Sequence, residues 1–149
     1  MENFNSIKTG LNEIDNIING IYPSELVTIA QRPDANRISF LCKLVKEMCK
    51  ENEALYFLLQ MNKEIFKAKL LSCISGMSET DILENKKVDS KYEEELNSLK
   101  LEICDDTKVN INSFDSVIRK AYSERGIKVI LIDYVPLLFP ERSAKESLS

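Results

Sequence analysis

Apolar positions along this chain follow two patterns in turn, one typical of helices and one typical of buried strands. An apolar residue at every third or fourth position predicts an amphipathic helix, and an unbroken apolar run predicts a strand covered on both faces. The helical pattern covers residues 11–18, 38–52, 63–75 and 113–125, with shorter stretches from Ser78 or Glu79 and over 90–100. The strand pattern covers residues 26–30, 54–59, 101–104 and 128–132. Because strands alternate with helices, we expect an α/β fold with a mainly parallel sheet, in one domain spanning residues 1–149.

Polar residues and glycine mark where several of these helices begin and end. Thr9, Asn62 and Asn112 are predicted N-caps, because their side-chain oxygens can accept hydrogen bonds from the N–H groups of a first helical turn. Asn19 and Gly126 follow two of the helices and suit the left-handed conformation that ends a helix.

The composition suits a folded protein and argues against several functional classes. Of the 149 residues, 44% are hydrophobic and 30% are charged, and the net charge is −4. This balance provides no general attraction to nucleic acid, and we expect none to bind by itself. The first residues have neither the basic nor the apolar segment of a signal peptide, and no apolar run approaches the about 18 residues of a membrane helix. We therefore expect a cytoplasmic protein that is not attached to a membrane.

Metal chemistry is not expected either. The four cysteines are Cys42, Cys49, Cys73 and Cys104, no two of them form a C-x-x-C pair, and histidine is absent. A zinc site is therefore not predicted. Cys42 and Cys49 share one face of a predicted helix and are interpreted as small core residues.

The stretch from residue 26 to residue 40 is read as a strand, a tight loop and the first turn of a helix. In nucleotide-binding α/β domains a phosphate-binding loop occupies this place, and it ends in glycine, lysine and serine or threonine. This chain has Asn36, Arg37 and Ile38 there. The architecture of a phosphate site is thus predicted without its usual chemistry.

Several short segments, in order, resemble one known family. They are Thr-Gly-Leu at 9–11 with Asp15 and Asn-Gly at 19–20, Pro-Ser-Glu-Leu at 23–26, Ala-Gln-Arg-Pro at 30–33, Phe-Leu-Leu-Gln-Met at 57–61, Cys-Asp-Asp at 104–106 and Val-Ile-Leu-Ile-Asp-Tyr at 129–134. Together they resemble the RecA-like ATPase domain of DnaB-type replicative helicases, over residues 7 to 143. The resemblance implies a P-loop NTPase-type three-layer α/β fold and a role in DNA replication.

The family's phosphate loop is only partly retained. Asn36 can adopt a left-handed conformation in place of glycine. Arg37 is a planar fork where the family has the compact charge of lysine, and Ile38 has no hydroxyl to contact magnesium. Arg32 and Arg37 remain as cations, whereas Asp34 adds a negative charge to the loop. We expect Mg-ATP binding to be weak or absent, with no resident cofactor.

Residues that the resemblance assigns to catalysis are also changed. The family's catalytic glutamate, which activates water, falls on Gln60, and its polar sensor glutamine falls on Pro136. An amide cannot take a proton, and losing a general base costs about 10²–10⁴ in rate. Asp133 keeps the family's magnesium-orienting aspartate, although an ordinary aspartate at a strand end is an equal alternative. The resemblance thus implies a vestigial nucleotide site made of Arg32, Asn36, Arg37, Ile38, Gln60 and Asp133.

The end of the chain raises a further expectation. In the family another strand follows and lies between the fourth strand and the phosphate-loop strand, so the fold is expected to be truncated after its Walker B-like strand. Either residues 128–132 then pair directly with residues 26–30, or a gap leaves two open strand edges. The apolar tail contains Leu137, Leu138 and Phe139, which either pack on the chain's own sheet or mediate binding. We expect these three residues and the sheet edge to mediate self-association or partner binding.

Three functions remain open. The first is a catalytically degenerate DnaB-like domain that contacts a replicative helicase, another replication protein or its own copies. The second is a residual ATP-binding or NTPase domain, favoured by Arg32, Arg37 and Asp133. The third is a nucleic-acid-binding module of the replication apparatus, which is supported only by the family resemblance.

Overall fold

The computed structural model describes residues 6–30, 32, 36–84, 86–106, 109–133 and 135–138, the last group without the side chains of Pro136 and Leu137. These residues fall into two compact units. The first lies within Met1–Glu51 and Ala68–Leu99, and the second within Asn52–Lys67 and Lys100–Ser149. Whether they act as the single predicted domain stays a prediction, and each unit is described by itself.

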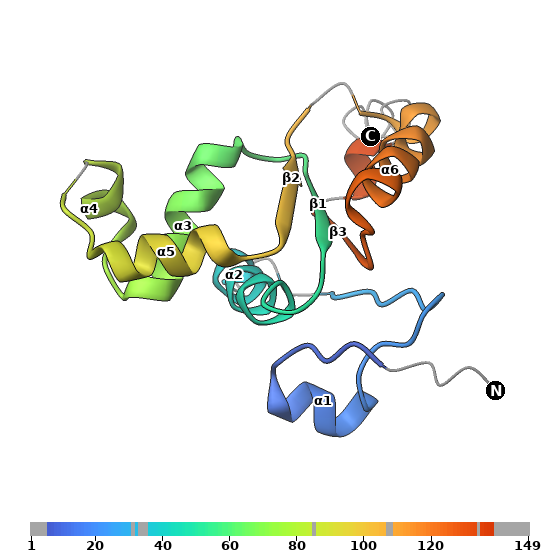
Figure 1. Ribbon diagram of the computed structural model, residues 1–149, viewed down its shortest axis with the longest axis horizontal. Helices are drawn as coiled ribbons and strands as arrows, with labels where there is room; N and C mark the ends of the chain where they lie inside the picture. The colour runs from blue at the N-terminus through green and yellow to red at the C-terminus, as the bar shows by residue number, and fades with distance from the viewer. Residues whose placement is uncertain are drawn as a thin grey trace. The chain divides into compact units, whose positions relative to one another are not determined.

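The second unit is built on a parallel sheet. Its strands are β1 (Ala54–Leu58), β2 (Leu101–Cys104) and β3 (Val129–Asp133), in the order β2-β1-β3 (Figure 1). Ala54 pairs with Leu101 on one side and with Val129 on the other. All five residues of β1 are buried, as expected for the central strand of a sheet covered on both faces. The predicted α/β class and parallel pairing are confirmed.

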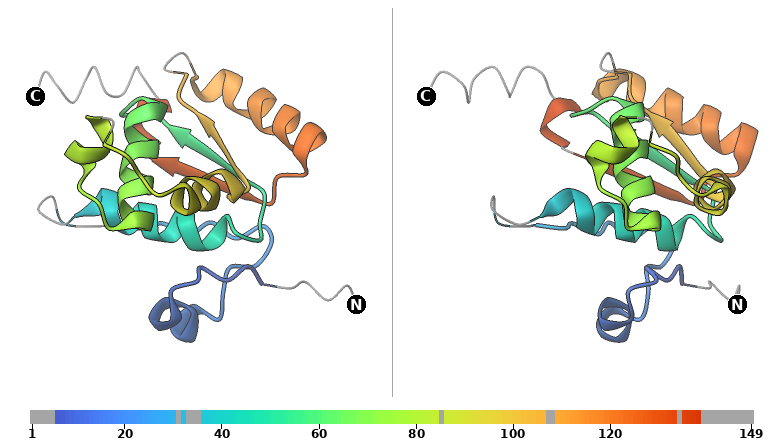
Figure 2. Two further views of the ribbon diagram at one scale, coloured as in Figure 1. Left: turned by 60° about the vertical axis from the view of Figure 1, so that its left-hand side comes forward. Right: turned by 90° about the vertical axis from the view of Figure 1, so that its left-hand side faces the viewer.

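Helix α6 (Ile111–Arg125) packs on one face of this sheet (Figure 2). The core between them contains Leu55 and Phe57 of β1, Leu59 just after β1, and Ala121 of α6. It also contains Val109 before α6, Ile127 after α6, and Leu138 after β3. The rings of Phe57 and Phe114 lie 4.6 Å apart between centroids. Helix and sheet are therefore joined by an apolar interface, which the amphipathic pattern of α6 makes possible.

The N-cap of α6 lies two residues before the predicted one. Asn110 takes this position: its side chain accepts the N–H groups of Asn112 and Ser113, at 2.9 and 3.4 Å, and Ser113 Oγ accepts the N–H of Asn110 at 3.1 Å. The prediction of Asn112 as the cap was wrong, because this reciprocal box needs the acceptor three residues before Ser113. Gly126 ends the helix at φ +65°, as predicted.

The first unit is helical. It contains α1 (Asn12–Ile18), α2 (Arg37–Met48), the later part of α3 (Lys63–Ser75), α4 (Glu79–Leu83) and α5 (Ser90–Ser98). Helix α2 buries Cys42, Leu44, Val45 and Met48, and Cys49 directly after it is buried too, which confirms the prediction that Cys42 and Cys49 are core residues. It ends four residues earlier than predicted, because the chain turns at residues 49–53 before entering β1.

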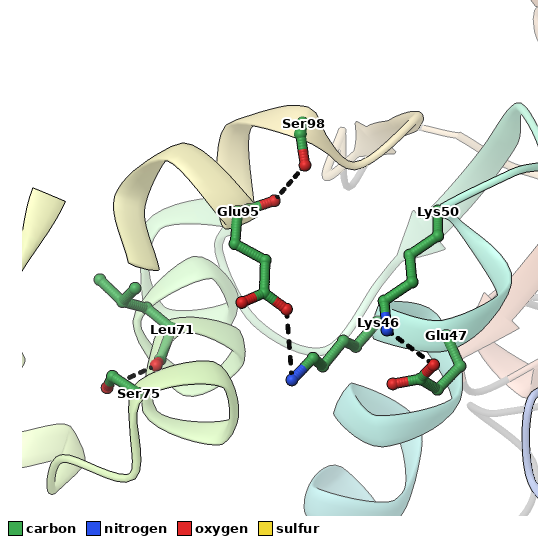
Figure 3. A network of polar contacts seen from close by, with 7 residues as sticks. All are labelled: Lys46, Glu47, Lys50, Leu71, Ser75, Glu95 and Ser98. Atoms are coloured by element: carbon green, nitrogen blue, oxygen red, sulfur yellow. Dashed lines mark hydrogen bonds and ion pairs between the residues drawn. The ribbon is translucent and has the colours of Figure 1, made fainter. Parts of the chain in front are cut away.

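Ion pairs lie on the outer surface of these helices. Lys46 of α2 reaches Glu95 of α5, with 3.3 Å between Nζ and Oε1, and Lys50 pairs with Glu47 within one turn at 2.8 Å (Figure 3). Such surface pairs contribute about 0–1 kcal/mol each. Apolar burial, rather than these pairs, therefore holds the helices together.

The predicted strand at residues 26–30 is not formed. These residues are neither helix nor strand, and Leu26, Val27 and Ile29 are 91%, 47% and 48% exposed. A strand is stable only when a neighbouring strand takes up its backbone hydrogen bonds. No strand in the described parts of the chain pairs with this segment. Within the second unit β3 pairs with β1, and the direct pairing of residues 128–132 with residues 26–30, which belong to the first unit, stays a prediction.

Candidate functional site

The carboxyl edge of the sheet brings together two of the predicted site residues. Asp133 is the last residue of β3 and pairs in register with Leu58, two residues before Gln60. The Asp133 side chain is 4% exposed, whereas Gln60 is exposed. Ligands of open parallel sheets bind beyond the carboxyl ends of the strands. This edge therefore carries a buried carboxylate and, after the neighbouring strand, an amide that cannot act as a base.

Asp105, which follows β2 at the same edge, has a structural task. Its Oδ2 accepts the N–H of Lys63 at 3.0 Å, and Asn62 Oδ1 accepts the N–H of Ile65 at 2.9 Å. Two of the first N–H groups of α3 are thus satisfied, one by the predicted cap Asn62 and one by a carboxylate 42 residues away. Sequence reasoning missed this role, because only pairing of β1 with β2 places Asp105 beside the start of α3.

The remaining predicted site residues surround the start of α2, in the first unit. Asn36 caps the helix: its Oδ1 accepts the N–H of Ser39 at 3.3 Å. Its φ is −75°, so the left-handed conformation considered for it is not adopted, and the capping bond explains the difference. Arg32 is exposed, while Arg37 and Ile38 lie in the first turn of α2. Asp34 lies outside the described residues.

A carboxylate clamp orders the chain before α1. Asp15 Oδ1 accepts the N–H and the hydroxyl of Thr9, at 2.8 and 2.9 Å, and its Oδ2 accepts the N–H of Gly10 at 3.0 Å. Although burial raises the pKa of Asp15, hydrogen bonds from Thr9 and Gly10 and the charge of Lys8 bring it below the ordinary value. The prediction of Thr9 as the N-cap of α1 was therefore wrong, and Leu11 takes that position. Thr9 Oγ1 instead accepts the N–H of Leu11 at 3.1 Å.

Cysteine and metal chemistry find no support among the described residues. These residues contain no group of three or more cysteines or carboxylates that could hold a metal ion. Cys42 is 1% exposed, and burial raises its pKa to about 12. Burial also raises the pKa of Cys104. Both thiols therefore stay protonated and unreactive at neutral pH. Cys73 of α3 is exposed.

The predicted interaction tail is described only in part. Leu138 is 2% exposed and belongs to the core between α6 and the sheet, so it is not an exposed binding residue. Its burial follows the alternative in which the tail packs on its own sheet, since the short 3₁₀ helix Val135–Leu138 directs it inward. The side chains of Leu137 and Pro136 and all of Phe139 lie outside the described residues.

No helix that the structure describes is long and apolar enough to cross a membrane.

The chain was compared with known sequences. A family model for the DnaB-like helicase C terminal domain matches residues 6–148. Replicative DNA helicases DnaB from Buchnera aphidicola (subsp. Baizongia pistaciae) and Haemophilus influenzae are 25% and 24% identical to it over 142 and 143 residues. Each match takes in 89% of this chain but 31% of the relative. The chain thus spans about a third of the length of these relatives.

Solved structures of similar fold point the same way. One solved ATPase domain superposes with a TM-score of 0.80 at 22% identity, covering 91% of this chain and 51% of that one. A DnaB-like replicative helicase, solved in a study of its interactions with primase, superposes with a TM-score of 0.79 at 22% identity, covering 91% and 35%. At this identity the likeness concerns the fold, and the predicted RecA-like α/β class is confirmed.

Proposed function

We propose, since this chain belongs to the DnaB-like helicase C-terminal domain family, that it is a member which serves DNA replication through contact with proteins and does not hydrolyse ATP. The observation that carries the proposal is Gln60 at the carboxyl edge of the sheet. This residue stands where the resemblance places the glutamate that activates water. It is exposed just after the central strand, whose last residue pairs with Asp133 in the neighbouring strand.

The chemistry of Gln60 supports the proposal directly. A general base speeds hydrolysis by taking a proton from the attacking water; a carboxylate can take this proton, whereas a carboxamide can only orient the water. The loss of a general base lowers the rate by about 10²–10⁴. Neither Asp105 nor Asp133 replaces the missing glutamate, because Asp105 accepts the N–H of Lys63 and Asp133 is buried at the end of β3.

The start of α2 adds a second, independent change. Ile38 has no oxygen with which to ligate magnesium, and Arg37 presents a wide guanidinium in place of an ammonium group. Asn36 already accepts the N–H of Ser39. The helix start therefore retains its dipole, which favours an anion, while the specific contacts to a magnesium nucleotide are reduced.

A residual nucleotide-binding function is the second candidate. The buried carboxylate of Asp133 favours it, because a carboxylate at the end of a strand is the group that orients magnesium in P-loop enzymes. Binding without turnover would suit a domain that uses a nucleotide to stabilise one shape. Binding of single-stranded DNA is the third candidate. The net charge of −4 disfavours it, because single-strand binding relies on a positively charged groove.

The proposed partners are proteins of the replication apparatus. A similar structure was solved in a study of its interactions with primase, so a primase is one candidate for this chain. A replicative helicase and further copies of the chain itself are the others. The proposal requires that at least one of these binds.

The test is phosphate release from ATP by the purified chain, with and without single-stranded DNA, next to two variants. Asp133→Ala removes the carboxylate at the sheet edge, and Asp115→Ala removes an exposed carboxylate of α6 as a control. We expect all three proteins to show only background release, and the wild type to retain primase, helicase or further copies of itself on a biosensor surface. Turnover that Asp133→Ala abolishes and Asp115→Ala preserves would overturn the proposal.

A further inference from the structure

We propose that Asn19 and Gly20 form a site of spontaneous deamidation, which the fold keeps unreactive, and that its reaction releases the arm around α1. This α1 arm comprises residues 6–22. The inference is independent of the proposed function, because it concerns the covalent chemistry of the α1 arm alone. Asn19 is the only asparagine in the chain that is followed by glycine. Since glycine has no side chain to obstruct a ring that includes its nitrogen, this asparagine is the one most open to the reaction.

The reaction needs only water and a base. Hydroxide removes the proton of the Gly20 N–H, and the nitrogen attacks the side-chain carbonyl carbon of Asn19. The new N–C bond replaces the bond to Nδ2, which takes up a proton and leaves as ammonia, so that a cyclic imide remains. A water molecule opens this imide at either carbonyl and gives aspartate or isoaspartate. Nothing is oxidised or reduced, and the neutral amide has become a carboxylate.

The backbone of Asn19 keeps the two reacting atoms apart. Asn19 follows α1 in the left-handed conformation, with φ 58° and ψ 25°, and its N–H donates to the carbonyl of Asp15 at 2.9 Å. The angle ψ is the torsion between the nitrogens of Asn19 and Gly20, so a small ψ places both on nearly the same side of the Cα–C bond. The Cβ that carries the amide is another branch of the tetrahedral Cα. Ring closure therefore requires ψ to turn until the Gly20 nitrogen faces Cβ.

Side-chain contacts hold the Asn19 amide in this unreactive arrangement. Lys8 Nζ donates to the backbone oxygen of Asn19 at 3.0 Å and to its Oδ1 at 3.2 Å. Asn19 Nδ2 donates to Tyr22 Oη at 3.2 Å. The amide is thus bound at both of its polar atoms, and these bonds must break before it can meet the backbone nitrogen.

The backbone around Gly20 is fixed as well. Ile7 and Ile21 form an antiparallel bridge, in which each N–H donates to the other's carbonyl at 2.8 Å. Gly20 is buried at φ +87°, and a Cβ added to it would lie 2.8 Å from Ser6 Oγ. A turn of ψ at Asn19 would displace Gly20 and its neighbours. The α1 arm must therefore open locally before the reaction, and the rate follows the population of the open arm.

The isoaspartyl product cannot restore the original arm. Isoaspartate carries the main chain through the former side chain, which lengthens the backbone by one carbon just before the bridge between Ile7 and Ile21. The arm also meets α2 at Gly10, where an added Cβ would overlap Cβ of Glu47. This close approach tolerates little displacement of the arm. Deamidation thus acts as a one-way change that loosens the α1 arm from α2.

Peptide mass spectrometry of the chain kept at mildly alkaline pH measures the reaction at each asparagine. We expect Asn19 to deamidate at least about ten-fold faster in urea than in the native chain. Asp15→Ala removes the carboxylate that orders the start of the arm, and should move the native rate at least about three-fold towards the unfolded rate. Lys8→Ala should act in the same direction, because it frees the amide.

Two controls accompany this measurement. Glu13→Ala changes an exposed carboxylate of the same helix and should leave the rate at Asn19 as in the wild type. Asn16 is exposed in α1 but is followed by isoleucine, and should react far more slowly than Asn19 in urea. Equal rates at Asn19 in the native and unfolded chain, or wild-type rates in both Asp15→Ala and Lys8→Ala, would overturn the inference. Equal rates at Asn16 and Asn19 in urea would overturn it too.

Hydrogen exchange followed by NMR tests the release of the arm. Aged protein, enriched in the isoaspartyl form by chromatography, should exchange the N–H groups of Ile7 and Ile21 at least about ten-fold faster than fresh protein. Asn19→Asp is the matched control, because it has the new charge but the original main chain, and its carboxylate can still accept from Lys8. This variant should exchange like fresh wild type. Unchanged exchange in the aged protein, or equally fast exchange in Asn19→Asp, would overturn the proposed release.

Discussion

The carboxylate of Asp105 accepts the backbone N–H of Lys63 at 3.0 Å, so the end of β2 caps the first turn of α3. Each N–H at a helix start needs a partner, and a negative charge there is favoured by the helix dipole. The bond also fixes the path of residues 59–62, which carry Gln60 from the end of β1 to the helix. The geometry of the candidate site therefore depends on a residue that takes no part in its chemistry.

Replacing Asp105 with alanine should lower the free energy of unfolding by about 1 kcal/mol, the usual value of a lost helix cap. Asp105→Asn keeps an acceptor oxygen and should cost less. Urea denaturation followed by circular dichroism measures both. Asp115→Ala, which removes only an exposed ion pair with Arg119, is the control and should leave the urea midpoint almost unchanged. Equal losses in all three variants would contradict the capping role.

Asp15 should make stability depend on pH in the acid range. Its pKa in the folded chain lies below the ordinary value of 3.8, so the unfolded chain binds its proton first as the pH falls. The stabilisation is therefore complete above about pH 5 and is lost as the pH falls through the folded pKa. Asp15→Asn should destabilise the chain by about 1 kcal/mol at pH 7, because asparagine keeps one acceptor oxygen but loses the charge and the second acceptor, to which Thr9 and Gly10 donate.

The check is thermal unfolding of the wild type and Asp15→Asn between about pH 2.5 and pH 7, a range that brackets the titration of a carboxylate. The difference between the two proteins should shrink as the pH is lowered. Glu13→Gln, an exposed change on the same helix that leaves the clamp intact, should follow the wild type. A difference that is constant with pH would show that Asp15 acts through its shape and not through its charge.

The cysteines should differ sharply in reactivity. Burial raises the pKa of Cys42 to about 12, and Cys49 is also buried, whereas Cys73 is exposed. Iodoacetamide at about pH 8 should therefore modify Cys73 first and leave Cys42 untouched until the chain unfolds. Mass spectrometry of tryptic peptides, with and without urea, provides the measurement. Rapid labelling of Cys42 in the native chain would contradict the burial of α2.

Nucleotide affinity should respond to restoration of the phosphate-loop chemistry. We expect the wild type to bind Mg-ATP too weakly for a micromolar Kd by calorimetry, since Ile38 has no hydroxyl and Arg37 replaces lysine. The double variant Arg37→Lys, Ile38→Thr should bind at least about ten-fold more tightly if the start of α2 still presents its N–H groups. Thr28→Ser, a conservative change in the preceding segment, is the control. Micromolar binding by the wild type would favour the residual nucleotide-binding function instead.

Local signals in the sequence were sufficient for most of the helices and for three strands. Apolar periodicity located α2, α3 and α6, and Asn62, Asn19 and Gly126 were placed correctly as helix boundaries. These features are decided within a few residues, because a cap or an amphipathic face involves only the turns next to it. The family resemblance of residues 7 to 143, carried by short motifs in order, also needed no structure.

Tertiary structure alone decided what depends on distant partners. Residues 26–30 have the composition of a strand but no neighbour, so the described sheet has three strands where four were predicted. The sequence left two alternatives for Leu138, a place in the core or a place on a binding surface. In the structure Leu138 is buried against α6 and the sheet. Asp105 became a cap only because parallel pairing brought the end of β2 to the start of α3. In each case the deciding contact joins residues far apart in the chain, which no local pattern specifies.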